Sequence, residues 1–198
     1  MSNYPYLATE GNCCITPGDN NYSYMGGCYL KGNPINNYIW YSGFLWRIMG
    51  INADGTVRMI VDENVTSIPW GAEDWDGSHA KEWLNDYFYN RLKGNDIITN
   101  QIWCSEITTD ISSARTTCTT NLSTEPAKVG LISLDEYNLA GSATSYLNIK
   151  QNQWMITPYS SSSAWVVNNH GSSGTTTVTP AYGLRPVIVV NSNVTIIS

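Results

Sequence analysis

The chain has 198 residues and a formal net charge of −6 at pH 7; 42% of its residues are hydrophobic and only 13% are charged. This length suits one domain with a sizeable core. The sequence has no basic run, which argues against nucleic acid and anionic membranes as partners. It also has no stretch near the roughly 18 apolar residues of a spanning helix, so no membrane insertion is expected.

The five cysteines bear on where the protein works. The N-terminus lacks the charged and apolar start of a signal peptide, so the chain is either cytoplasmic or an ectodomain without its targeting segment. Cys104 and Cys118 bracket a polar loop, and a disulfide there would contribute about 3 kcal/mol in the loop-entropy model. Cys28 is expected to pair with Cys14 or Cys13. Five buried thiols are the alternative, but the loops around them are polar. We therefore expect an extracellular or cell-surface protein.

The N-terminal half is predicted to contain an irregular leader and a meander. Residues 1–28 show no periodic pattern and are expected to be tied down by a disulfide, whereas residues 29–198 form a single domain. Strands are predicted over 38–41 and 44–49, because two small residues between them suit a tight hairpin. A third strand over 56–62 follows an Asp-Gly turn.

One main amphipathic helix is predicted over residues 78–93. Ser78 is a favourable N-cap residue, and the Gly-Asn pair after Lys93 is a typical helix end. The apolar residues of the segment fall on one predicted stripe, formed by Trp83, Leu84, Tyr87, Phe88 and Leu92.

The central segment is predicted to be a long surface loop or small subdomain over 104–128. A strand over 129–133 follows it. Ser133 with Glu136 three residues later predicts a capping box and a short helix over 134–139.

Three short strands are predicted in the last third, over 154–157, 164–168 and 185–190. The middle one alternates as a half-buried strand does, and the last is continuously apolar, so both its faces should be covered. Gly183 suggests a positive φ or a close approach of the backbone. Arg185 enters the core region, so its guanidinium should be paired or should cap carbonyl groups.

The same segment carries a resemblance. Trp154-x-Ile-Thr-Pro and Gly183-Leu-Arg-Pro-Val-Ile resemble the C-terminal signature of a bacterial extracellular domain family. That family is related to the formylglycine-generating-enzyme branch of the C-type-lectin-like fold. The resemblance extends upstream to Trp46-Arg47-Ile, Trp83-Leu84-Asn85 and the segment 131–137, and so covers residues 29–198. One arginine of the family pattern is replaced by Ile156-Thr157.

The resemblance implies an α+β fold of the C-type-lectin-like kind, with twisted antiparallel sheets, one main helix and long loops. The related enzymes use cysteines near the C-terminal strands, and this chain has none after Cys118, so that activity is not expected here. His79 and His170 have no metal-ligand pattern around them, and no metal site is predicted. The scattered loop carboxylates are expected to be solvated, although they leave room for a structural calcium ion. No other cofactor is expected.

Loop aromatics next to Asn and Ser residues are the best candidates for ligand contacts, because such rings suit sugars and peptides. The predicted ligand-binding residues are Trp70, Trp75, Tyr159, Trp165, His170 and Tyr182. The composition and the resemblance together indicate a non-catalytic recognition or adhesion domain for a glycan or protein ligand, as the head of a larger surface or pilin-like protein. The alternatives are a hypervariable ligand-binding protein of the same fold and a divergent oxidase or hydrolase.

Overall fold

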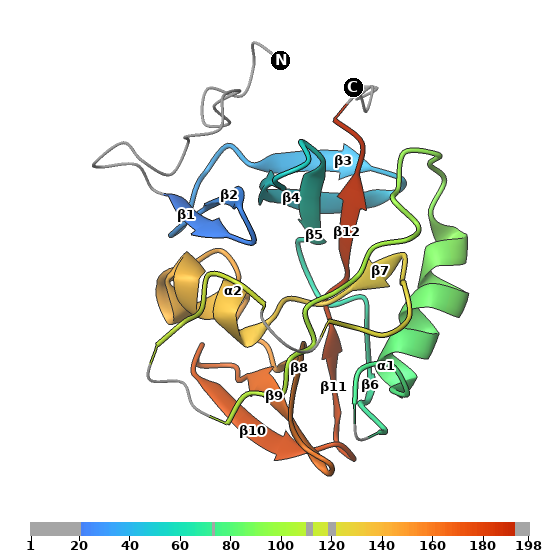
Figure 1. Cartoon of the computed structure of the whole chain (residues 1–198), viewed down its shortest axis with the longest axis vertical. Coiled ribbons are helices and arrows are strands. Elements are labelled where there is room, and N and C mark those ends of the chain that lie inside the picture. Colours follow the sequence, from blue (N-terminus) through green and yellow to red (C-terminus); the bar gives the residue numbers. More distant parts are fainter. Residues whose placement is uncertain (1–20, 73, 110–112, 119–121, 193–198) are drawn as a thin grey trace.

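The computed structural model of the chain describes residues 21–72, 74–109, 113–118 and 122–192, which contain two β-sheets (Figure 1). In the view of Figure 1 one sheet occupies the upper half and the other the lower half. The upper sheet has the order β1-β2-β4-β5-β12-β7, with β3 paired to β4. Its strands are β1 (Asn21–Tyr24), β2 (Gly27–Leu30), β3 (Tyr38–Tyr41), β4 (Phe44–Ile51), β5 (Val57–Val61), β7 (Val129–Gly130) and β12 (Val187–Val190).

The lower sheet has the order β10-β9-β8-β11-β6. Its strands are β6 (Thr66–Pro69), β8 (Gln153–Ser160), β9 (Ser163–Val167), β10 (Ser173–Thr177) and β11 (Ala181–Leu184). The named strand pairs in both sheets are antiparallel, except that β11 pairs with β8 in parallel. The described helices are α1 (His79–Glu82), η1 (Trp83–Phe88), η2 (Tyr89–Arg91), α2 (Leu134–Ala140) and η3 (Ser142–Thr144). This arrangement belongs to the α+β class, as the sequence predicted.

The predicted meander is confirmed in β3, β4 and β5. Ser42 and Gly43 both have positive φ (53° and 83°), as a tight two-residue hairpin requires. Gly50 in β4 allows the neighbouring strand to come close, because a Cβ there would lie 2.2 Å from the carbonyl oxygen of Cys28. The apolar face of the meander contains Trp46, which is fully buried.

The predicted helix begins at the expected cap and differs from the prediction further along. The hydroxyl of Ser78 accepts a hydrogen bond from the backbone N–H of Lys81 (3.0 Å). After α1, however, the segment continues as the π-helix η1 and then as a 3₁₀ turn that ends at Arg91. The wider turn of a π-helix changes which side chains share a face. Phe88 is therefore buried, whereas Tyr87, expected on the core stripe, is 62% exposed.

The irregular leader predicted over residues 1–28 is wrong for its last eight residues. β1 pairs with β2 in an antiparallel ladder, and Tyr22 and Tyr24 are buried in the upper sheet. Cys28 is disulfide-bonded, as expected. Its expected partners, Cys14 or Cys13, lie outside the described residues.

The C-terminal strands of the lower sheet are more extensive than predicted. β10 occupies a Ser/Thr/Gly stretch in which no strand was predicted. β9 was expected to be half-buried, yet its residues 164–167 are all buried. β9 is buried because the segment around Thr108 is hydrogen-bonded to both β8 and β9. The N–H of Thr108 donates to the carbonyl of Pro158 (3.1 Å), and its carbonyl accepts from the indole of Trp165 (2.7 Å).

Arg185 lies between β11 and β12, and its predicted role is confirmed. The side chain is 1% exposed. Its Nε donates to the carbonyl of Val61 (2.7 Å), and its Nη1 donates to the carbonyl of Leu147 (3.0 Å). Burial lowers the pKa of Arg185 to about 10, because desolvation disfavours the charged guanidinium. The residue therefore supplies donors to carbonyl groups that no strand pairs.

Candidate functional site

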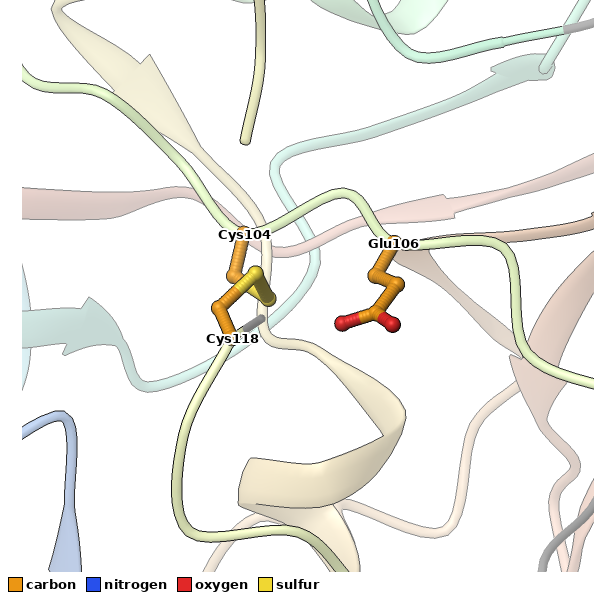
Figure 2. Close-up of side chains that lie close together, drawn as sticks. All are labelled: Cys104, Glu106 and Cys118. Atoms are coloured by element: carbon orange, nitrogen blue, oxygen red, sulfur yellow. A yellow bond between two sulfur atoms is a disulfide. The ribbon is translucent and has the colours of Figure 1, made fainter. Parts of the chain in front are cut away.

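The disulfide between Cys104 and Cys118, predicted from their spacing, is present. Figure 2 shows the carboxylate of Glu106 beside it, and the two sulfurs and this carboxylate lie within 4.8 Å of one another. A thiolate is the form of cysteine that binds metal, and both sulfurs are bonded to each other. The group therefore acts as a structural staple of the 104–118 loop rather than as a metal site.

An ion cluster next to this disulfide holds the same loop. Arg115 pairs with Glu106 through Nη1 (2.7 Å) and with Asp135 through Nε (3.1 Å) and Nη2 (2.8 Å). Its Nη2 also donates to the hydroxyl of Thr108 (2.7 Å). Both carboxylates are held by charge-assisted hydrogen bonds to the same guanidinium, and this arrangement fixes the loop against α2.

A second ion pair is buried between the upper sheet and α2. Arg58 contacts Glu136 through Nε (2.9 Å) and Nη2 (3.1 Å), and its guanidinium lies 4.6 Å from the centre of the Trp103 ring. Glu136 also accepts from the N–H of Ser133 (2.9 Å), which completes the predicted capping box. The general expectation of solvated carboxylates is wrong for Asp135 and Glu136, since both are buried.

The predicted ligand-contact aromatics separate into two groups. Trp70, Trp75 and Trp165 are 0%, 0% and 5% exposed, so the expectation that these rings face solvent is wrong. Gly-rich and Ser-rich loops around them suggested exposure, but the rings pack into the core. Trp70 lies between Trp75 and Trp154, with ring centroids 5.8 Å from each.

The remaining three predicted residues are accessible and lie in different places. Tyr159 is 36% exposed near the end of β8 and packs edge-on against Trp165. His170 is exposed in the turn before β10. Tyr182 in β11 lines a pocket, and its ring centroid lies 5.1 Å from that of Trp154. Of the six residues, Tyr182 is the one that the structure places at a cavity in the described part of the chain.

This pocket has a volume of about 320 Å³ and lies on the outer side of the lower sheet, over β6 and β11. Its lining is neutral and polar, and consists of Asn64, Ser67, Gln151, Asn152, Ala181, Tyr182 and Gly183. Side chains alternate along a strand, so Ala181 and Gly183 face the pocket, whereas the ring of Tyr182 points to the opposite face toward Trp154. The floor of the pocket is therefore small and flat.

Three amide side chains stand over this floor in a fixed arrangement. The Nδ2 of Asn64 donates to the Oε1 of Gln151 (3.0 Å) and to the backbone carbonyl of Asn152 (3.3 Å). The Oδ1 of Asn152 accepts from the N–H of Asn169 (2.9 Å), and the N–H of Gly183 donates to the carbonyl of Asn152 (3.0 Å). The pocket thus joins the segment before β6, strand β11 and the segment before β8 through hydrogen bonds.

Sequence reasoning missed Asn64, Gln151 and Asn152. Asparagine and glutamine are common in turns, so no local pattern distinguishes a turn residue from a pocket residue. The available signal was the run of neutral polar residues at 151–153, where β8 begins.

A second exposed feature is an apolar face on the β3–β4 hairpin. Trp40 is 63% exposed and pairs across the hairpin with Leu45, which is 37% exposed. Tyr38 is 44% exposed on the same face, under the guanidinium of Arg47 (4.3 Å to the ring centre). This face belongs to the upper sheet, whereas the pocket lies on the lower sheet.

The chain matches no protein-family model, no curated protein and no solved structure. The relation to the formylglycine-generating-enzyme branch therefore stays a prediction from the sequence motifs. The C-type-lectin-like fold stays a prediction as well. Among the helices that the structure describes, none is both long and apolar enough to cross a membrane.

Proposed function

We propose that this chain is a non-catalytic recognition domain that binds a glycan in the pocket over β6 and β11. It would act outside a bacterial cell, as a secreted protein or as the head of a larger surface or pilin-like protein. The observation that carries the proposal is the pocket lining. Amide and hydroxyl groups surround a small flat floor, and such neutral hydrogen-bonding groups match the hydroxyl-rich surface of a sugar.

The same lining favours binding over the divergent-enzyme alternative. Among its described residues, the ionisable side chain is that of Tyr182, and its ring points away from the cavity. A general acid or base needs a group that titrates near the working pH and reaches the substrate. The carboxylates of Glu106, Asp135 and Glu136 are instead paired with arginines.

The extracellular location is supported by the disulfides. The Cys104–Cys118 bond and the bonded state of Cys28 fit an oxidising compartment. The low share of charged residues and the many Asn, Ser, Thr and Tyr residues point the same way.

A glycan array with the purified domain tests the proposal, followed by a calorimetric titration of the best ligand. The blocking variant is Ala181→Trp, which places a large ring in the pocket at a position exposed to solvent. We expect it to abolish binding and leave the melting temperature unchanged.

The matched control is Thr175→Trp, which adds the same ring at an exposed position of β10 in the same sheet. It should bind as the unmodified protein does. Trp40→Ala removes an exposed ring on the other sheet and should also bind normally. An array without any bound glycan, or full binding by Ala181→Trp, would overturn the proposal.

A further inference from the structure

The three pocket amides are oriented by groups whose donor or acceptor character is certain. The backbone N–H of Asn169 can only donate, so the side-chain atom of Asn152 that meets it is the oxygen (2.9 Å). The backbone carbonyl of Asn152 can only accept, so the atom of Asn64 that meets it is the nitrogen (3.3 Å). That nitrogen also donates to Gln151 (3.0 Å), which makes the contacting atom of Gln151 its oxygen.

The oxygens of Gln151 and Asn152 are therefore occupied within the protein, and their NH₂ groups are left for a ligand. Neither NH₂ group has a hydrogen-bond partner among the described residues. The third amide adds no accessible acceptor, because the Oδ1 of Asn64 is buried. The side-chain amides at the pocket therefore offer hydrogen-bond donors to a ligand and no free hydrogen-bond acceptor.

This one-sided pattern separates sugar classes. A hydroxyl group both donates and accepts, so against these amides a simple hexose uses only its weaker acceptor capacity, and the hydroxyl of Ser67 is left to accept from it. An acetamido group offers a carbonyl oxygen, which is a strong neutral acceptor, and a methyl group that fits beside the Cβ of Ala181. The lining carries no cationic side chain among its described residues, and the chain has a net charge of −6, so an acidic sugar gains no ion pair.

We propose that the pocket selects an N-acetylated hexosamine, whose acetamido carbonyl accepts hydrogen bonds from the Nε2 of Gln151 and the Nδ2 of Asn152. The cavity volume of about 320 Å³ is enough for one such sugar unit and is too small to enclose a long oligosaccharide. This inference rests on the proposed function and names the ligand class of the same site.

Two nearly isosteric substitutions isolate the donors. Gln151→Glu and Asn152→Asp each keep the oxygen that accepts inside the protein and replace the NH₂ group by a second oxygen. Asn169→Asp is the matched control, because it adds the same negative charge beside the pocket without removing a lining donor. Melting temperatures establish that all three variants fold.

The experiment titrates the domain with the methyl glycosides of N-acetylglucosamine, glucose, glucosamine and glucuronic acid, followed by NMR. We expect the acetamido sugar to bind about tenfold more tightly than glucose, the effect of one or two neutral hydrogen bonds. Gln151→Glu and Asn152→Asp should each remove this preference, and Asn169→Asp should keep it.

The outcomes separate the inference from the proposed function. Equal binding of glucose and N-acetylglucosamine, or a preference for glucuronic acid, would overturn the acetamido inference and leave a sugar site. Unchanged preference in both donor variants would overturn it as well. Binding of none of these sugars, together with an empty glycan array, would overturn the proposed function itself.

Discussion

The side-chain amide of Asn64 occupies the space in which a Cβ at Gly183 would stand, since that Cβ would lie 2.0 Å from the Asn64 Nδ2. The glycine of β11 therefore positions the amide that in turn orients Gln151. The predicted close approach at Gly183 is confirmed and concerns a side chain at the pocket.

Gly183→Ala should displace Asn64 and disturb the pocket. We expect a loss of about 1–3 kcal/mol in the free energy of unfolding, as in other overpacked sites, and at least a tenfold loss of sugar affinity because the amides lose their orientation. Urea denaturation and titration measure the two effects. Gly174→Ala in β10 is the control, because a Cβ there meets nothing within 4 Å. Equal stability and affinity of the two variants would contradict the role of Gly183.

Arg185→Ala should leave the carbonyl group of Val61 buried without a donor and remove one of the two donors to the carbonyl of Leu147, which still accepts from the Nε2 of Gln153 (2.9 Å). The expected loss is about 1–3 kcal/mol in the free energy of unfolding, the cost of one unsatisfied buried group. Arg185→Met should also be destabilising, since it fills the space without supplying donors. Arg91→Ala, at an exposed helix end, should change stability by less than about 0.5 kcal/mol. A melting temperature of Arg185→Met equal to that of the unmodified protein would refute the donor argument.

Removal of the Cys104–Cys118 disulfide should loosen the 104–118 loop. The double variant Cys104→Ser/Cys118→Ser is expected to lose about 3 kcal/mol, the entropy of closing a loop of this size, for a sequence separation of 14. Peptide mapping of the non-reduced protein should recover the two cysteines in one cross-linked fragment. Recovery of Cys104 as a free thiol would contradict the structure.

Stability should fall in alkaline solution because several tyrosines are buried beside the upper sheet. Burial raises the pKa of Tyr29 to about 12, and desolvation also raises the pKa values of Tyr22, Tyr24 and Tyr146. A tyrosine whose pKa is raised in the folded state contributes its full stabilisation below its unfolded pKa of about 10. This contribution is lost as the pH rises toward the folded pKa of about 12.

Arg185 acts in the opposite direction over the same range. Its folded pKa is lowered to about 10, so the folded protein releases this proton first and gains relative stability as the pH rises. Four tyrosines outweigh one arginine, and the net effect should be destabilising. Urea midpoints measured between about pH 9 and 11.5, with tyrosinate absorbance as a second signal, check this. A constant midpoint across that range would contradict it.

The parts of the fold that the sequence predicted are those with a local cause. Ser42-Gly43 requires a tight hairpin, and Ser78 and Ser133 each cap the helix that follows, so a short window of sequence was sufficient. The π-helix η1 has no such local signal, and it moved Tyr87 out of the core face. β10 was missed because Ser, Gly and Thr are also typical of loops, and its pairing with β9 is decided by tertiary contacts.

The candidate site was less predictable than the fold for the same reason. Asn64 and Gln151 are 87 positions apart and meet because β11 pairs with both β6 and β8. The tryptophans were misplaced because a large ring in a Gly-rich loop fits either a surface or a core. Trp70 and Trp75 became core residues once the loop folded over Trp154.

The two residues between β11 and β12 have a consequence for how the protein unfolds. Arg185 and Pro186 carry the chain directly from the lower sheet into the upper one, as the two red strands of Figure 1 show. β11 pairs with both β6 and β8, and β12 pairs with both β5 and β7, so this two-residue link ties an interior strand of one sheet to an interior strand of the other. The two sheets should therefore melt in a single cooperative transition, and partial proteolysis should yield no stable half of the molecule.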